Sequence, residues 1–173
     1  EGKAYRLPTK KELEVSDIEE TKLDLSIIPN EEMKEIPDLV SGRGWGISKW
    51  SQMFAARQLV TLQTLIVKFN DIKHQLHDPT IEYSKAILSY LGILIDRIAV
   101  ANTSFGIWHT GRETLERIMG RQAIPMVFDY PESNPFCHSS GSASNQLDWL
   151  TRYIESECTQ PFSTVLQNAS RGE

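Results

Sequence analysis

His74, His77 and Asp78 are the best-spaced metal-ligand residue types in the chain, forming the pattern H-x-x-H-D at the end of a predicted helix. Residues three apart share one helix face, so both imidazoles could reach a single ion. No third ligand cluster of known spacing accompanies them, and a helix C-terminus favours histidine electrostatically in any case. Cys137 and His138 are adjacent, which is a poor spacing for chelation, and there is no C-x-x-C. We therefore expect no metal site.

Ser104, His109 and Asp129 supply the residue types of a hydrolytic triad. The nucleophile elbow G-x-S-x-G is absent, and so are the phosphate-binding patterns G-x-x-x-x-G-K-[ST] and G-x-G-x-x-G. A small stand-alone hydrolase is therefore supported by residue types alone and by no sequence motif.

Asn134, Pro135 and Phe136 are similar to part of [DNS]-P-P-[YFW], the tetrapeptide with which amino-methyltransferases hold a target amine and stack a flipped base. One proline is missing here and no strand cleanly precedes the motif. We therefore reject it as a catalytic tetrapeptide and interpret residues 120–136, "GRQAIPMVFDYPESNPF", as a structural strap.

A polar and aromatic cluster is expected where Asn102, Trp108, His109 and Arg112 follow the second long helix. Stacking and guanidinium contacts from such a cluster could hold a nucleic-acid strand. The alternative, which the chemistry alone favours, is that these side chains cap helix ends and satisfy buried backbone groups. The DNA-contact candidates are Arg43, Lys49, Arg57, Gln58, Arg112, Arg121 and Gln122.

The charge distribution confines any nucleic-acid surface to the middle of the chain. The net charge is -5, with -5 over residues 1–40 (6 basic, 11 acidic), +4 over residues 41–122 (10 basic, 6 acidic) and -4 over residues 123–173 (2 basic, 6 acidic). A surplus of four is a weak signal, and a solvated helix surface explains it more readily.

The hydrophobic pattern predicts a mainly α fold with a long antiparallel helical hairpin, shorter helices, extended straps and one short C-terminal strand. Asp78 should cap the second long helix and Pro79 should be its first residue. This helix is apolar on most faces and should be buried on several sides, and the hairpin of the two long helices should be the centre of the core. The expected helices run over about residues 10–20, 55–77, 79–101, 112–120 and 146–158; residues 102–113 should be loop, and residues 163–167 a strand.

Three regions follow from this pattern. Residues 1–40 form an N-terminal helix and extended arm, residues 41–160 a helical domain, and residues 161–173 the remnant of a larger catalytic α/β domain. We expect a piece of a longer protein, because the chain begins without methionine and ends on a lone strand.

Composition is typical of a soluble protein, with 40% hydrophobic and 24% charged residues. Asp96 and Arg97 interrupt the richest apolar run, which is too short to cross a bilayer, and no secretory leader is evident. We expect a cytoplasmic protein that makes no membrane contact and keeps Cys137 and Cys158 reduced.

Several blocks, taken in order, resemble one region of the large adenine-specific DNA methylases that contain a zinc ribbon. The blocks are "YRLPTKKELE", "GWGISKWSQMFAARQLVTLQTLI", residues 86–136 and "SASNQLDWLTRYIE". One departure is Ala55-Ala56, where that family often has a proline at the helix start. The residues that fit the family pattern are Trp45, Gly46, Trp50, Phe54, Arg57, Gln58, Leu59, Asn102, Trp108, His109, Gly120, Arg121, Gln122, Pro125, Met126, Asp129, Asn134, Pro135 and Phe136.

The resemblance implies a helical, target-recognising region of an S-adenosylmethionine-dependent DNA adenine-N6 methyltransferase. In that family the cofactor glycine motif lies upstream of this region and the catalytic D-P-P-Y motif lies downstream, and neither is in these 173 residues. The chain alone should therefore be inactive and hold no cofactor. Its expected partners are DNA and the remaining methyltransferase domain, and self-association into a homodimer is open. The alternative is a non-enzymatic helical module that binds a protein through its aromatic straps.

Overall fold

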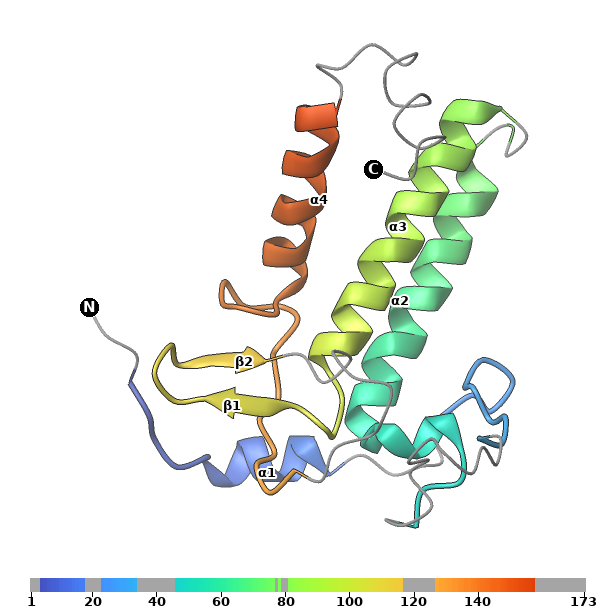
Figure 1. Cartoon of the computed structure of the whole chain (residues 1–173). Coiled ribbons are helices and arrows are strands. Elements are labelled where there is room, and N and C mark those ends of the chain that lie inside the picture. Colours follow the sequence, from blue (N-terminus) through green and yellow to red (C-terminus); the bar gives the residue numbers. More distant parts are fainter. Residues whose placement is uncertain are drawn as a thin grey trace.

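A computed structural model describes residues 4–17, 23–33, 46–76, 78, 81–116 and 127–157 of the chain. These residues form four α-helices, one short 3-10 helix and one antiparallel sheet of two strands, so the predicted mainly α fold is confirmed (Figure 1). The predicted strand at residues 163–167 lies outside the described residues, as do the candidate positions Arg43, Trp45, Arg121 and Gln122.

Helix α1 spans Lys10–Ser16 and begins as the sequence predicts. Thr9 and Glu12 form a capping box, in which the Thr9 hydroxyl accepts from the Glu12 N–H at 3.3 Å and the Glu12 carboxylate accepts from the Thr9 N–H at 2.7 Å. The helix ends at Ser16, four residues before the predicted end, with Asp17 as its C-cap. None of its residues is buried, so the cap rather than packing defines it.

Helices α2 (Ala56–Gln75) and α3 (Glu82–Ala101) form the predicted antiparallel hairpin (Figure 1). The prediction that Asp78 caps α3 is wrong, because the cap is Ile81. The Asp78 carbonyl instead accepts from the Ile81 N–H at 3.3 Å, ahead of the helix. Helix α2 ends at Gln75 and α3 begins at Glu82.

Helix α3 is less buried than predicted. It packs on α2 and on α4 (Ala143–Glu157), and only Ser84, Ile98 and Ala101 along it are buried. Two flanking helices cannot cover an apolar helix on every side, which leaves Ile93 44% exposed. Helix α4 begins three residues earlier than predicted.

Residues 107–116 form a β-hairpin where the sequence analysis expected loop followed by helix. Strands β1 (Ile107–His109) and β2 (Thr114–Glu116) pair antiparallel, with Trp108 opposite Leu115. The expected helix fails because Glu113 has a positive φ of 48° and the His109 Nδ1 accepts from the Arg112 N–H at 3.0 Å, which closes a four-residue turn. Tyr5 packs edge-on against Trp108, with ring centroids 6.5 Å apart.

The core lies at the base of the helical hairpin, where residues 23–33 cross it. Met33 and Met53 are its most buried members, and Met53 belongs to the 3-10 helix η3 (Trp50–Met53). The Met33 N–H donates to the Ser48 carbonyl at 2.8 Å, and the Ser104 N–H donates to the Met53 carbonyl at 2.9 Å. Packed against this pair are Ile47, Phe54, Phe105 and Ile107.

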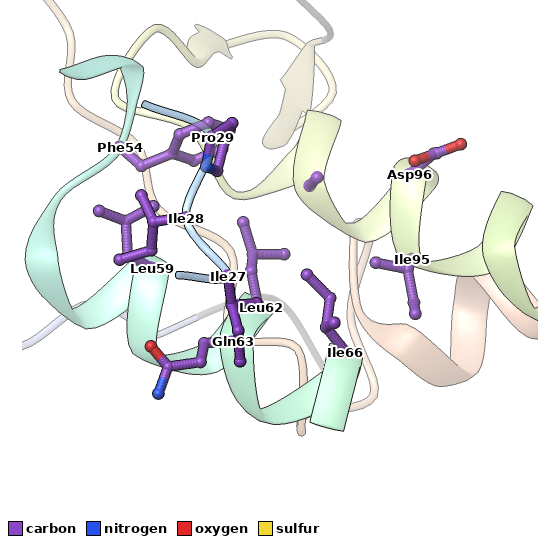
Figure 2. A pocket seen from close by; sticks show the side chains of 11 residues that line it. Ile27, Ile28, Pro29, Phe54, Leu59, Leu62, Gln63, Ile66, Ile95 and Asp96 are labelled. Carbon is purple, nitrogen blue, oxygen red and sulfur yellow. The ribbon is translucent and has the colours of Figure 1, made fainter. Parts of the chain in front are cut away.

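An apolar hollow of about 220 Å³ lies between the 27–29 segment and the α2–α3 pair (Figure 2). Its few polar groups are Gln63 and Asp96, and the Gln63 Oε1 already accepts from the Asp24 N–H at 2.8 Å. This hollow reflects loose packing where the crossing segment meets the hairpin. Among the described helices, none combines the length and apolar character that crossing a membrane requires.

Candidate functional site

A second hollow, of about 270 Å³, brings together three segments that are far apart in the sequence. Helix α2 contributes Arg57 and Thr61, the end of α3 contributes Asn102, and residues 132–136 form the remaining wall. We name this feature the polar hollow. It contains five of the residues singled out from the sequence: Arg57, Asn102, Asn134, Pro135 and Phe136.

Arg57 reaches the hollow because the first turn of α2 is fixed by its own cap. The Gln58 side chain is 1% exposed, and its Oε1 accepts from the Ala55 N–H at 2.8 Å. This bond satisfies the N–H of Ala55, the N-cap, whose own side chain has no oxygen to accept from the first turn of the helix. Gln58, a DNA-contact candidate, thus occupies an interior position, and its Nε2 lacks a hydrogen-bond partner in the described part of the chain.

An ion pair between Arg57 and Glu132 closes one side of the hollow. The Arg57 Nε donates to the two Glu132 carboxylate oxygens at 2.9 and 2.7 Å, and Nη2 also contacts this carboxylate. The two side chains are 37% and 26% exposed, so the pair is half-buried. Hydrogen bonding to Glu132 raises the pKa of Arg57, so the guanidinium stays charged.

The opposite wall is a turn built by Asn134. Its Oδ1 accepts from the Phe136 N–H at 2.9 Å, and its carbonyl accepts from the Cys137 N–H at 3.3 Å. The Pro135 carbonyl accepts from the Ala143 N–H at 2.8 Å, which ties this turn to the first residue of α4. The turn leaves the Phe136 ring 78% exposed at the edge of the hollow.

Two of the lining side chains are buried and polar. Asn102, the C-cap of α3, is 3% exposed, and no hydrogen bond joins its side-chain amide to another described residue. Ser133 is 7% exposed, and its Oγ has no hydrogen-bond partner within the ranges described. That oxygen lies against Gly141, where an added Cβ would be only 2.9 Å away.

The other described candidates do not line the polar hollow. Lys49 precedes η3, and Trp50 within it is 47% exposed. Arg112 is exposed in the β1–β2 turn, and Asp129 is exposed ahead of Glu132.

Trp108 and His109 belong to the hairpin rather than to the polar hollow. The Trp108 ring meets Tyr5, and the His109 Nδ1 accepts the Arg112 N–H while Nε2 lies 3.6 Å from the Glu116 Oε1. The Ser104 hydroxyl lies 3.2 Å from the Tyr130 hydroxyl rather than against an imidazole.

Sequence reasoning missed Glu132, Thr61 and Ser133. The only local hint of a role for Glu132 is that it is a carboxylate within the strap, two residues before Asn134. Its pairing with Arg57 joins residues 75 apart, which no local pattern reveals. As for metals, the described residues contain no group of three or more His, Cys, Asp and Glu side chains suited to holding an ion.

The chain matches no protein-family model, no curated protein and no solved structure.

Proposed function

We propose that this chain is a helical DNA-contacting region of an S-adenosylmethionine-dependent DNA adenine-N6 methyltransferase, with catalysis supplied by the remaining methyltransferase domain. The observation that carries the proposal is the polar hollow. Arg57 belongs to one block that resembles the family, Asn102 and Asn134 lie 32 residues apart in another block, and all three line this one feature.

Within this proposal the chain's own residues bind DNA and perform no chemistry. The sequence holds neither the cofactor glycine motif nor the D-P-P-Y tetrapeptide, so methyl transfer by this chain alone is not expected. S-adenosylmethionine would bind to the remaining domain. The Arg57–Glu132 ion pair in the wall of the hollow holds residues 127–136 of the strap against α2.

The cations proposed to contact phosphate are Lys49 and Arg112. Arg112 is exposed and Lys49 partly exposed, and neither side chain has a salt bridge to a described residue. Arg57 differs, because Glu132 already neutralises it and a phosphate would have to displace that carboxylate. We therefore assign Arg57 to positioning the strap and the two other cations to binding.

Fluorescence anisotropy with a labelled DNA duplex tests this assignment. Binding should weaken steeply between low and high salt, because each phosphate contact releases condensed counterions. Lys49→Ala and Arg112→Ala should each weaken binding and make the salt dependence shallower. The matched control is Lys68→Ala, which removes one exposed positive charge from α2 and should change little. Absence of binding at low salt, or an equal loss in the control, contradicts the proposal.

A second candidate function is favoured by the exposed aromatic side chains. Phe128 is 91% exposed, Phe136 78%, Trp149 56% and Tyr153 55%, and the last two lie four residues apart on α4. Exposed aromatic residues at this density are typical of protein-binding surfaces. A protein-interaction module would bind its partner with little salt dependence and would leave duplex DNA unbound. Sedimentation velocity at two concentrations tests whether the partner is a second copy of this chain.

A further inference from the structure

Three exposed apolar side chains come together across α3 and α4, which run antiparallel (Figure 1). The Arg97 Nε of α3 donates to the Gln146 Oε1 of α4 at 2.8 Å, which fixes how the two helices lie against each other. Ile93 is one turn from Arg97 on the same face of α3, and Trp149 and Tyr153 are one and two turns from Gln146 on the same face of α4. Because both helices rise by about 1.5 Å per residue, Ile93 lies level with the stretch between the two rings.

These three residues, which we name the α3–α4 patch, are uncovered by the described part of the chain. Ile93 is 44% exposed, Trp149 56% and Tyr153 55%. A large aromatic side chain has roughly 150–250 Å² of surface, so the three exposed fractions amount to about 300 Å² of apolar surface in one copy. An apolar patch of this size on adjoining helices is typical of an interaction surface.

The charges beside the patch make α4 complementary to itself. Asp148 and Arg152 are exposed and lie four residues apart on α4, yet neither makes a salt bridge to a described residue. If two copies of α4 pack antiparallel around a two-fold axis midway between the rings, Trp149 of one copy lies opposite Tyr153 of the partner. The same arrangement brings Arg152 within one turn of the partner's Asp148, and symmetry repeats both contacts.

We infer that the α3–α4 patch is the interface of a homodimer in which α4 packs antiparallel on α4 of a second copy. Two patches contribute about 600 Å² of apolar surface, and interfaces are roughly 56–65% apolar, so the total buried area is about 1,000 Å². That area is near the lower limit for a specific interface, and we expect a dissociation constant on the order of 10–100 μM. The inference goes beyond DNA contact and gives the protein-interaction candidate a definite partner.

Sedimentation velocity of the 173-residue chain over a concentration series tests the inference. The weight-average sedimentation coefficient should rise from the monomer value to the dimer value. Trp149→Ala and Tyr153→Ala should each weaken dimerisation roughly tenfold or more, as central aromatic residues of an interface do. Both side chains are more than half exposed, so their loss leaves the core intact. The matched control is Phe128→Ala, which removes a 91% exposed ring outside the patch and should leave dimerisation unchanged.

Charge reversal tests the antiparallel arrangement itself. Asp148→Arg should weaken dimerisation by roughly fivefold or more at low salt, because it places like charges together at two symmetric positions, and Arg152→Asp should do the same. A mixture of the two variants should dimerise again, because each chain then presents to its partner the charge opposite to its own. Circular dichroism of each variant checks that α4 is still formed.

A chain that stays monomeric throughout the concentration series overturns the inference. So does a dimer that survives both aromatic substitutions, because its contact lies elsewhere, and so does a mixture that fails to recover. Duplex binding is measured separately by fluorescence anisotropy. Failure of dimerisation therefore leaves the DNA-contact proposal standing, and failure of DNA binding leaves the dimer interface standing.

Discussion

Arg57 and Glu132, 75 residues apart in the sequence, form a two-pronged ion pair that joins the first turn of α2 to the strap before α4. This contact connects the strap of residues 127–136 to the helical hairpin through side chains rather than through a sheet. The geometry of the polar hollow therefore depends on two side chains that no sequence pattern associates.

A double-mutant cycle on Arg57→Ala and Glu132→Ala should give a coupling free energy of about 1 kcal/mol, because the pair is half-buried and bidentate. Urea unfolding of the four proteins measures it. The control cycle is Lys68→Ala with Asp71→Ala, an exposed pair at 71% and 49%, where about 0.3 kcal/mol or less is expected. Equal coupling free energies in the two cycles would show that the Arg57–Glu132 pair stabilises the protein no more than an exposed ion pair does.

Helix α1 should lose helicity as the pH falls through the acid range. Hydrogen bonds from Arg6 and Thr9 hold the pKa of Glu12 well below its usual range. A depressed pKa in the folded state means that the stabilisation is complete above the ordinary glutamate pKa and disappears as the pH falls below it. Carbon chemical shifts of residues 10–16, followed by NMR between pH 7 and acid, measure this loss. Glu12→Gln should make the helicity of α1 lower at neutral pH and nearly independent of pH.

Gly141→Ala should destabilise the protein by about 1–3 kcal/mol, because the residue has a φ of +86° and an added Cβ would lie 2.9 Å from the Ser133 Oγ. Thermal unfolding followed by circular dichroism measures the change. The matched control is Gly92→Ala in α3, where nothing lies within 4 Å of an added Cβ. That substitution should stabilise by about 0.5–1 kcal/mol, since glycine is a poor helix former. If Gly141→Ala left the stability unchanged, the turn before α4 would have to change its backbone conformation without cost.

Local signals predicted the helices well. The Thr9–Glu12 spacing located the start of α1, and the apolar repeat of Leu59 and Leu62 located α2, because capping and amphipathicity depend on residues within one or two turns. The hairpin at residues 107–116 was missed because its formation depends on a positive φ at Glu113 and on cross-strand pairing, which override helix propensity.

The candidate site was less predictable than the helices. Arg57, Asn102 and Asn134 were singled out by residue type and pattern, and the structure brings them together. Glu132, the ion-pair partner of Arg57, could not be identified, since this contact is made only when the strap folds back across α2. The buried position of Gln58 could not be predicted either. A glutamine amide at the start of a helix can face solvent or accept a capping hydrogen bond, and the sequence does not distinguish the two.

Ser133→Ala should stabilise the free protein by roughly 1 kcal/mol, in contrast with most substitutions at buried positions. Its Oγ is enclosed and has no partner in the described part of the chain, so removing it eliminates a desolvated hydroxyl at the cost of one small atom's packing. Denaturant unfolding measures the change, and Ser142→Ala provides the comparison. Ser142 is 0% exposed, but its Oγ accepts from the Asn145 N–H at 3.3 Å and lies 3.1 Å from the Ser144 hydroxyl, so its loss should destabilise instead.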